Sequence, residues 1–195
     1  KPLDSLPPRP PKIVSPPETS DLPALWHSKD IGRPLKGGEV MSGDTLILYG
    51  GGNDIWTNKD QFRFVYQKLK ADFEISVKVN ELLYTHSYAK AVIMVRSGLK
   101  QNSAHGMINI FPGGNTEFGF REKSGDQMKA NSGPDLDWNT VKLKVTKKDD
   151  SLNFFVFNND DWIKQGELNI ENWGETLFVG VVALSHDDSQ LTIAK

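Results

Sequence analysis

The chain has 195 residues, a length that suits one domain with a substantial hydrophobic core. Its formal net charge of −2 gives no electrostatic reason to expect nucleic acid or an anionic membrane as a partner. No apolar run approaches the roughly 20 residues of a membrane-spanning helix. The chain has no cysteine, which excludes disulfides, thiolate metal sites and cysteine nucleophiles.

Residues 1–23 are rich in proline and differ in composition from the rest of the chain. Proline removes backbone donors and favours extended conformations, so this region cannot nucleate a core. We expect a tether or a strap laid on the edge of the domain, with a ligand for a proline-binding domain as the alternative. Because the first residue is Lys rather than Met, we also expect that an N-terminal segment was removed. The folded domain is expected to span residues 24–195.

Three glycines at residues 50–52 follow an apolar run and precede Asp54 and Trp56. A phosphate-binding loop requires a following helix and a Gly-Lys-Ser/Thr sequence, and a dinucleotide site requires a βαβ unit. Neither pattern is present, so the glycines predict a corner between strands. We expect Asp54 to bond the amides of this turn and Trp56 to plug the edge of a sandwich. The alternative is that the two residues form a platform for a sugar.

From Leu25 onward, apolar and polar residues alternate with a period of two, which is typical of half-buried strands. Clusters of Gly, Pro, Asn, Asp and Ser separate the runs. The principal runs are 44–49, 61–69, 71–82, 89–99, 104–112, 116–123, 137–148, 151–160 and 175–186. Many short strands at regular spacing predict an all-β fold, a two-sheet antiparallel jelly-roll sandwich.

Several of these segments occur in an order that is characteristic of one protein family. They include "GGGNDIWTNKDQFRFVYQKLKADFEISVKV", "AKAVIMVRSGL", "NSAHGMINI", "FGFREKSG", "WNTVKLKV" and "LFVGVVALSH". Over about residues 25–195 the chain resembles the DUF1349-like group of bacterial concanavalin A-like domains. The resemblance implies a concanavalin A-like sandwich in a secreted, periplasmic or surface-tethered protein connected with polysaccharides.

Carboxylates are not placed as glycoside hydrolysis requires. Such an enzyme needs two carboxyl groups flanking the scissile bond. The Glu-x-Asp-x-x-Glu pattern of concanavalin-like endoglucanases is absent, and Glu117 and Glu122 have an odd spacing that places them on opposite faces of a strand. The four histidines are scattered and no Gly-x-Ser-x-Gly elbow occurs. We therefore expect binding without cleavage and retain a glycoside hydrolase as the alternative.

Polar side chains on three successive strands lie opposite the core-facing residues of those strands. If hairpins make the strands neighbours, these side chains converge on one exposed sheet face. Arginine can bond sugar hydroxyls or a uronate, and tryptophan can stack on a sugar ring. The candidate ligand-binding residues are Arg96, His105, Asn109, Glu117, Arg121, Trp56, Trp138 and Trp162. The alternative is a charged network that only solvates the sheet.

The sequence thus predicts a non-catalytic carbohydrate-binding β-sandwich whose ligand is a glycan. A protein-interaction or structural module is a further alternative, although no feature identifies a protein partner. No cofactor is expected apart from a structural calcium ion, which needs six to eight oxygen ligands. Candidate calcium ligands are Asp54, Asn58 and Asp60 in one segment, and Asp187 and Asp188 in another.

Overall fold

The computed structural model describes residues 11–195, which form β-strands and loops without a helix. The strands are β1 (His27–Ile31), β2 (Gly38–Ser42), β3 (Thr45–Gly50), β4 (Phe62–Leu69), β5 (Phe73–Lys78), β6 (Lys90–Arg96), β7 (His105–Ile110), β8 (Asn115–Arg121), β9 (Lys129–Asp135), β10 (Lys142–Lys148), β11 (Ser151–Asn158), β12 (Asp161–Asn169), β13 (Leu177–Leu184) and β14 (Thr192–Ala194). The all-β prediction is confirmed.

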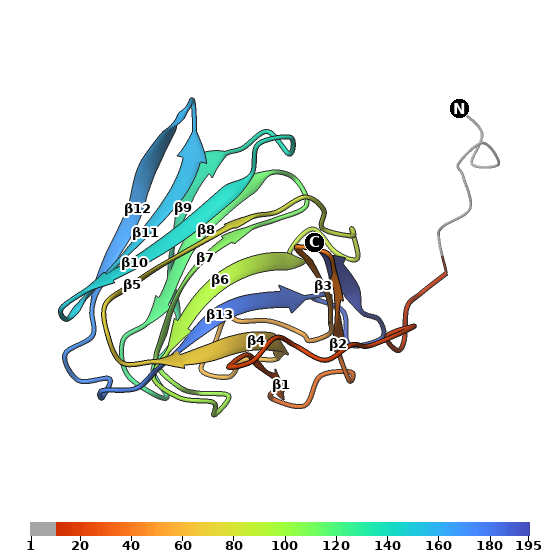
Figure 1. Cartoon of the computed structure of the whole chain (residues 1–195), viewed down its shortest axis with the longest axis horizontal. Helices are drawn as coiled ribbons and strands as arrows, with labels where there is room; N and C mark the ends of the chain where they lie inside the picture. Colours follow the sequence, from red (N-terminus) through yellow and green to blue (C-terminus); the bar gives the residue numbers. More distant parts are fainter. Residues whose placement is uncertain (1–10) are drawn as a thin grey trace.

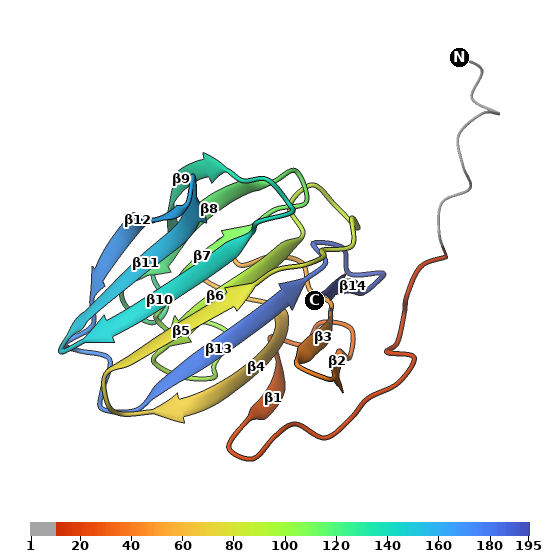
Figure 2. The same ribbon diagram turned by 45° about the horizontal axis from the view of Figure 1, so that its top comes forward.

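Three antiparallel sheets make up the molecule (Figure 1). The largest has seven strands in the order β1-β4-β13-β6-β7-β8-β9. A four-stranded sheet, β12-β11-β10-β5, packs against one part of it, and a three-stranded sheet, β14-β3-β2, covers another part (Figures 1 and 2). The arrangement is therefore a sandwich whose second layer is divided into two sheets.

The main core lies between the seven-stranded and the four-stranded sheets. In strands β10 and β11, alternate residues point into this core. Leu143, Val145 and Phe154 are among them, and none of the three has any exposed surface. Facing residues such as Ile93 and Ile108 join the same cluster. Complete burial of one such side chain stabilises the fold by about 1.5–3 kcal/mol, so this alternation fixes which side of each strand faces inward.

The other face of the seven-stranded sheet carries a second hydrophobic cluster. Every residue of β6 is buried, which requires cover on both faces of the sheet. Phe64, Met94 and Met107 point away from the main core and pack with Ile55, which comes from the loop before β4. This face is consequently an interior surface over part of its area.

Three loops provide the cover and are hydrogen-bonded to one another. They span residues 51–61, 97–104 and 122–128. The backbone N–H of Asp60 donates to the carbonyl of Gln101 (2.9 Å), and further backbone bonds join the first loop to Met128 and the second to Gly125. The loops therefore form one layer over the sheet.

The triple-glycine segment is a corner, as the sequence predicts. It follows β3 directly and no helix begins at Asp54. Gly52 has a φ of 122°, and an added Cβ would lie 2.0 Å from the carbonyl oxygen of Gln61. Only glycine tolerates both conditions without strain. The prediction that Trp56 plugs the edge of the sandwich is wrong, because 49% of its surface is exposed.

Part of the proline-rich region lies along the domain as an extended segment. The N–H of Ser20 donates to the carbonyl of Glu39 (3.0 Å), and the N–H of Leu191 donates to the carbonyl of Ile13 (2.6 Å). The remainder of the predicted tether, residues 1–10, lies outside the described residues. Within residues 11–195, helices of the length and hydropathy needed to cross a membrane are not found.

Candidate functional site

A closed ionic cluster lies at one end of the loop-covered sheet face. Arg96 is paired with His105 across β6 and β7, and His105 with Arg121 across β7 and β8, so the three side chains stand in one row. Asp60 descends onto this row from the loop above. Its Oδ2 accepts from Nη1 of Arg96 (2.8 Å), and its Oδ1 accepts from Nη2 of Arg121 (2.8 Å).

Electrostatics explain why Asp60 remains ionised although it is fully buried. Burial alone would raise the pKa of its carboxyl group, but His105, where its ring is protonated, and the two guanidinium groups, which are charged throughout, outweigh burial and lower it. The same burial lowers the pKa of His105 to about 3, so its ring is neutral near pH 7. Arg121 also donates to the carbonyls of Thr57 (2.7 Å) and Asp126 (2.9 Å). The cluster thereby anchors two of the covering loops.

The structure corrects one part of the predicted polar face and confirms another. Arg96, His105, Asn109 and Arg121 do share one face of the seven-stranded sheet, as their strand phase predicts. They are not exposed, because each has 0% of its surface accessible. The covering loops bury them. Direct contact with a glycan would require those loops to move.

A groove opens on the same sheet face beyond the edge of the covering loops. Its volume is about 750 Å³, which falls within the range of small-molecule sites. The residues that line it are Asp54, Trp56, Tyr88, Lys90, Phe111, Asn115, Thr116, Glu117, Ser132, Gly133, Asp135 and His186. Two of the predicted ligand-binding residues, Trp56 and Glu117, are therefore brought together here.

Aromatic rings stand at the rim of the groove. Trp56 is 49% exposed and Tyr88 is 56% exposed, which is unusual for side chains of this size. The ring of Tyr88 packs edge-on against Phe111, with ring centres 5.8 Å apart, and it also contacts His86 and His186. These contacts hold Tyr88 in place while one side of it remains open to solvent.

An ion pair lies deeper in the groove. Nζ of Lys90 is 2.7 Å from Oδ1 of Asp54, and the side chain of Lys90 is only 3% exposed. Oδ1 of Asp54 also accepts from the N–H of Ile55, which is the local turn bond that the sequence predicts. Nδ1 of His186 lies 3.6 Å from the other oxygen of Asp54. Burial lowers the pKa of His186, so this ring is neutral near pH 7.

Glu117 and Asn109 have buried polar atoms without hydrogen-bond partners among residues 11–195. They face each other across β7 and β8. Both amide atoms of Asn109 and Oε1 of Glu117 are buried without a partner among the described residues. Burial raises the pKa of Glu117, Lys90 opposes this shift, and the negative charge of Asp54 adds to it. Buried polar groups are nearly always hydrogen-bonded, so Glu117, which lines the groove, has unused capacity to bind a polar group there, whereas Asn109 is fully buried.

The other two predicted tryptophans lie elsewhere. Trp138 is half-buried, packs against the main core and donates its indole N–H to the carbonyl of Pro112 (3.0 Å). Trp162 is on β12, and its ring contacts Phe157 on β11. The structure therefore does not bring the three tryptophans to one surface.

Sequence reasoning missed the groove residues that come from loops and strand ends. Tyr88, Lys90 and His186 fall where the period-two pattern stops, so strand phase does not place them. The aromatic and polar segment at residues 84–88, "YTHSY", was the available signal. Such a concentration of exposed rings and polar groups in one loop is typical of a binding segment.

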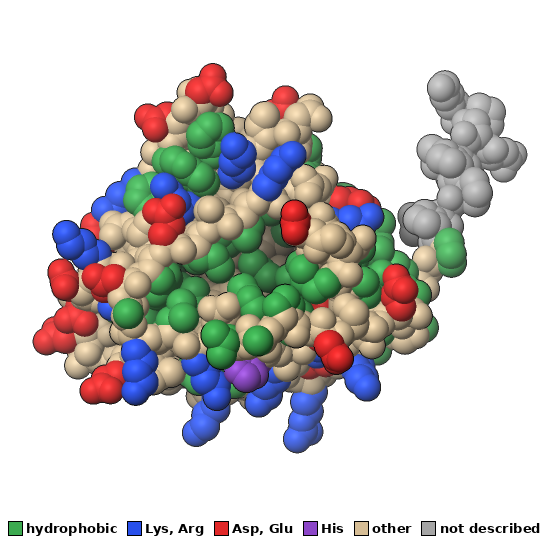
Figure 3. Space-filling view, viewed as in Figure 1, with side chains coloured by type: hydrophobic (Ala, Val, Ile, Leu, Met, Phe, Trp, Pro, Cys, Tyr) green, Lys and Arg blue, Asp and Glu red, His purple; other side chains and the backbone are tan. Residues whose placement is uncertain are grey.

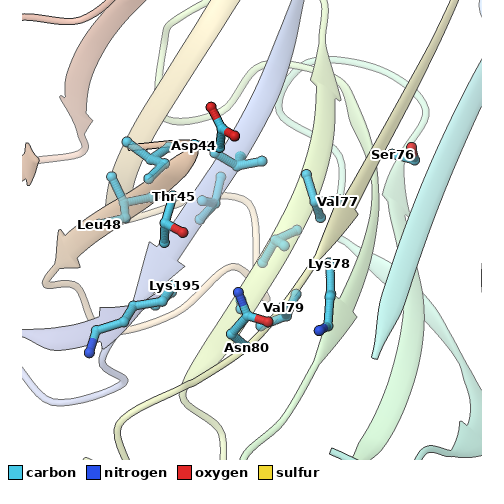
Figure 4. Close-up of a pocket in the computed structure, with 15 residues that line it drawn as sticks. Asp44, Thr45, Leu48, Ser76, Val77, Lys78, Val79, Asn80 and Lys195 are labelled. Atoms are coloured by element: carbon cyan, nitrogen blue, oxygen red, sulfur yellow. The ribbon is translucent and has the colours of Figure 1, made fainter. Parts of the chain in front are cut away.

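A second cavity, of about 350 Å³, lies where the divided second layer leaves a gap between β3 and β5 (Figure 4). Apolar side chains such as Leu48, Val77 and Val79 line it, and hydrophobic groups surround the hollow at the centre of Figure 3. Its charged groups, including Asp44 and Lys195, do not converge on one point (Figure 4). We attribute this cavity to the geometry of the sheets.

The acidic residues that suggest calcium have other partners. Asp54 is paired with Lys90, and Asp60 with two arginines. Oδ1 of Asp187 accepts from the backbone N–H and the hydroxyl of Ser189. No three acidic or histidine side chains among residues 11–195 group together as metal ligands would.

No protein-family model matches the chain, and no curated protein matches it significantly. Solved structures do match. A functionally unknown protein from Saccharomyces cerevisiae is 15% identical with a TM-score of 0.65, and the match covers 88% of this chain and 92% of that one. A legume lectin-like domain from Entamoeba histolytica is 9% identical with a TM-score of 0.55, covering 87% of this chain and 85% of the other.

The Bacteroides ovatus xyloglucan PUL protein GH43B is 18% identical with a TM-score of 0.55. That match covers 76% of this chain but only 31% of the Bacteroides protein. At these identities the similarity concerns the fold alone. The fold is accordingly that of the lectin-like, concanavalin-like β-sandwiches.

Proposed function

We propose that the groove binds a glycan without cleaving it. The observation that carries the proposal is the combination of a polar floor, where Glu117 has an oxygen without a partner among residues 11–195, and exposed rings at the rim, Trp56 and Tyr88. A pyranose has hydroxyl groups around its edge and C–H groups on its faces. The hydroxyls suit the amide and carboxyl groups of the floor, and the faces suit the rings.

The charges of the groove favour a neutral sugar. Asp54, Glu117 and Asp135 line it together with a single lysine, Lys90, which is already paired with Asp54. A carboxylate-bearing sugar would meet uncompensated negative charge in a partly buried site, which is unfavourable. The lectin-like fold is compatible with this role, and the order of sequence segments supports membership of the DUF1349-like group in a secreted, periplasmic or surface-tethered bacterial protein.

A glycan array followed by titration calorimetry tests the proposal. Xyloglucan oligosaccharides are included among the neutral probes because of the Bacteroides ovatus structure. With the sugar that the array selects, Trp56→Ala is expected to lower affinity by about tenfold or more, as loss of an aromatic anchor does. Its thermal melt should stay nearly unchanged, because Trp56 is half exposed.

The matched control is Trp162→Ala, which removes a ring from the other sheet. It should leave the affinity for the neutral sugar unaltered. Absence of binding across the array, or equal losses in the two variants, would contradict the proposal.

Glycoside hydrolysis is the second candidate, and one observation favours it. Two carboxyl groups line the same groove in different electrostatic settings: Glu117 has a raised pKa, whereas Asp54 is paired with a lysine. A carboxyl group that holds its proton more tightly, beside a carboxylate paired with a cation, matches the division of roles that hydrolysis needs. Release of reducing sugar that Glu117→Gln abolishes would support this candidate over binding alone.

A further inference from the structure

The outer face of the four-stranded sheet combines lysines with aromatic rings. This sheet lies at the front of the molecule in Figure 2. We define the lysine–aromatic face by six residues at its centre: Lys78, Lys142, Lys144, Phe155, Phe157 and Trp162. Their side chains point away from the main core, because their strand neighbours, such as Leu143 and Val156, point into it.

The register places these residues in two adjacent rows across the sheet. In the first row Lys78 is opposite Lys142, and Phe157 is opposite Trp162. In the second row Lys144 is opposite Phe155. Since neighbouring strands lie about 4.8 Å apart, a row across four strands spans roughly 14 Å. The face is thus longer than one sugar ring.

The aromatic rings hold two of the ammonium groups in fixed positions. Nζ of Lys142 lies 4.5 Å from the ring centre of Phe157. Nζ of Lys144 lies 4.3 Å from the ring centre of Trp162 and 5.2 Å from that of Phe155. Cation–π contact restrains side chains that are otherwise flexible. Less conformational entropy is then lost when an anion binds to them.

The lysine pair at the end of the first row is not neutralised. Among residues 11–195, neither Lys78 nor Lys142 forms an ion pair. Like charges directly opposite each other on neighbouring strands destabilise a sheet. Lys144 has only a distant partner, Glu74, at 3.9 Å. The face therefore retains positive charge on a protein whose net charge is negative, and an anionic ligand would relieve the repulsion.

We infer that the lysine–aromatic face is a second binding site, for a polysaccharide that bears carboxylate groups. The part-exposed rings offer apolar surface beside the lysines to the C–H groups of successive sugars, and the lysines pair with the carboxylates of those sugars. The site lies on the opposite sheet from the groove and differs from it in charge. It does not depend on the glycan-binding proposal for the groove, and either proposal can fail alone.

Charge density favours an acidic polysaccharide over nucleic acid. Double-stranded DNA carries one negative charge per about 1.7 Å of its axis, whereas a polyuronate carries one per sugar. Three lysines on a protein of net charge −2, with Glu74 and Glu167 at the border of the face, suit the lower density.

Titration calorimetry with polygalacturonate at low ionic strength tests the inference, with fully methyl-esterified polygalacturonate as the uncharged control. We expect polygalacturonate to bind with an affinity that falls steeply as salt is added. The esterified polymer, which has the same backbone without the charge, should bind at least about tenfold more weakly.

The decisive variant is Lys78→Gln/Lys142→Gln. It should lower the affinity for polygalacturonate about tenfold or more and leave the melting temperature equal to or above that of the wild type, because it removes a repulsive pair. The matched control is Lys29→Gln/Lys68→Gln, which changes the charge equally at exposed positions on β1 and β4. The control should change affinity less than about twofold.

Two further variants separate this surface from the groove. Trp162→Ala should weaken polygalacturonate binding, whereas Trp56→Ala should not affect it. The inference is overturned if polygalacturonate does not bind, or if the two lysine double variants lose affinity equally. It is also overturned if the esterified polymer binds the Trp56→Ala variant as tightly as polygalacturonate does, or if single-stranded DNA binds more tightly than polygalacturonate.

Discussion

Asp54 and Asp60 belong to one loop, and both carboxylates descend onto the same face of the seven-stranded sheet, yet their surroundings differ. Asp60 is fully buried and receives hydrogen bonds from two arginines. Asp54 is 30% exposed and pairs with one lysine beside a groove. Although the two residues are only six positions apart in the chain, Asp60 belongs to a closed ionic cluster and Asp54 to an open polar one.

The difference concerns the charged groups: those around Asp60 have partners among residues 11–195, and the buried atom left unpaired in that cluster is Nε2 of the neutral His105. Around Asp60 the guanidinium groups use their remaining donors on loop carbonyls, as Arg96 does with Gly98 and Lys100. In the groove that Asp54 lines, Glu117 retains a polar atom without a partner among the described residues. A satisfied buried network makes a structure unique, whereas an unsatisfied one beside a groove is suited to a ligand. The predictions below test this division of roles.

The largest effect is expected from Asp60→Asn. The substitution keeps the shape of the side chain but leaves Arg96 and Arg121 buried without a counter-charge. Removing one partner from a buried ionic cluster costs about 3–5 kcal/mol. For a domain of this size, that loss lowers the melting temperature by roughly 6 to 20 °C. Differential scanning calorimetry measures it.

Asp54→Asn is the matched control for that measurement. Because Asp54 is partly exposed and Lys90 also donates to the carbonyl of Tyr88 (3.3 Å), we expect this variant to lose only about 1 kcal/mol of folding stability. Equal losses in the two variants would show that the two clusters play the same structural role.

The sequence predicted which residues share the loop-covered face of the seven-stranded sheet, but it did not predict that loops cover that face. Period-two phase is a local property, and it placed Arg96, His105 and Arg121 correctly on one side. Their burial depends on Asp60, which lies 61 residues from Arg121 in the chain. No strand pattern encodes such a contact. The signal that was available is the apolar run of β6, which required cover on both faces of the sheet.

The second prediction concerns the acid stability of the closed cluster. His105 has a pKa of about 3 in the folded protein, chiefly because it is buried, against about 6.5 when unfolded. Between these values the unfolded chain binds a proton that the folded protein does not, so stability falls as pH is lowered below about 6.5. The slope from this residue approaches about 1.4 kcal/mol per pH unit.

His105→Phe removes the titrating group and retains a ring. Chemical denaturation from pH 7 to pH 4 should give a shallower loss of stability for this variant than for the wild type. His27→Phe, at an exposed position on β1, is the control and should retain the wild-type slope. Superimposable slopes for wild type and His105→Phe would contradict the burial of a neutral His105.

The groove was less predictable than the face because loops build much of its wall. Glu117 was identified from its strand phase, and Trp56 from the corner sequence. Tyr88 precedes β6 and His186 follows β13. These two strands are neighbours in the sheet. Their convergence results from strand order, which a single sequence does not specify. Trp138 and Trp162 were proposed on residue type alone, and the topology places them elsewhere.

The smallest effect on stability, and the sharpest test of the open cluster, is expected from Glu117→Gln. Burial chiefly raises the pKa of this carboxyl group, so the folded protein binds its proton more tightly than the unfolded chain. The stabilisation from that proton is complete below the unfolded pKa and is lost as pH rises through the folded pKa. The variant, which never ionises, should therefore be more stable than the wild type at pH 7 and indistinguishable from it near pH 4. Melts at the two pH values measure this, and calorimetry with the selected glycan should show weaker binding by the same variant. A gain in stability accompanied by a loss of binding identifies a residue retained for its ligand, whereas a variant that is less stable at pH 7 would place Glu117 with Asp60 among the structural anchors.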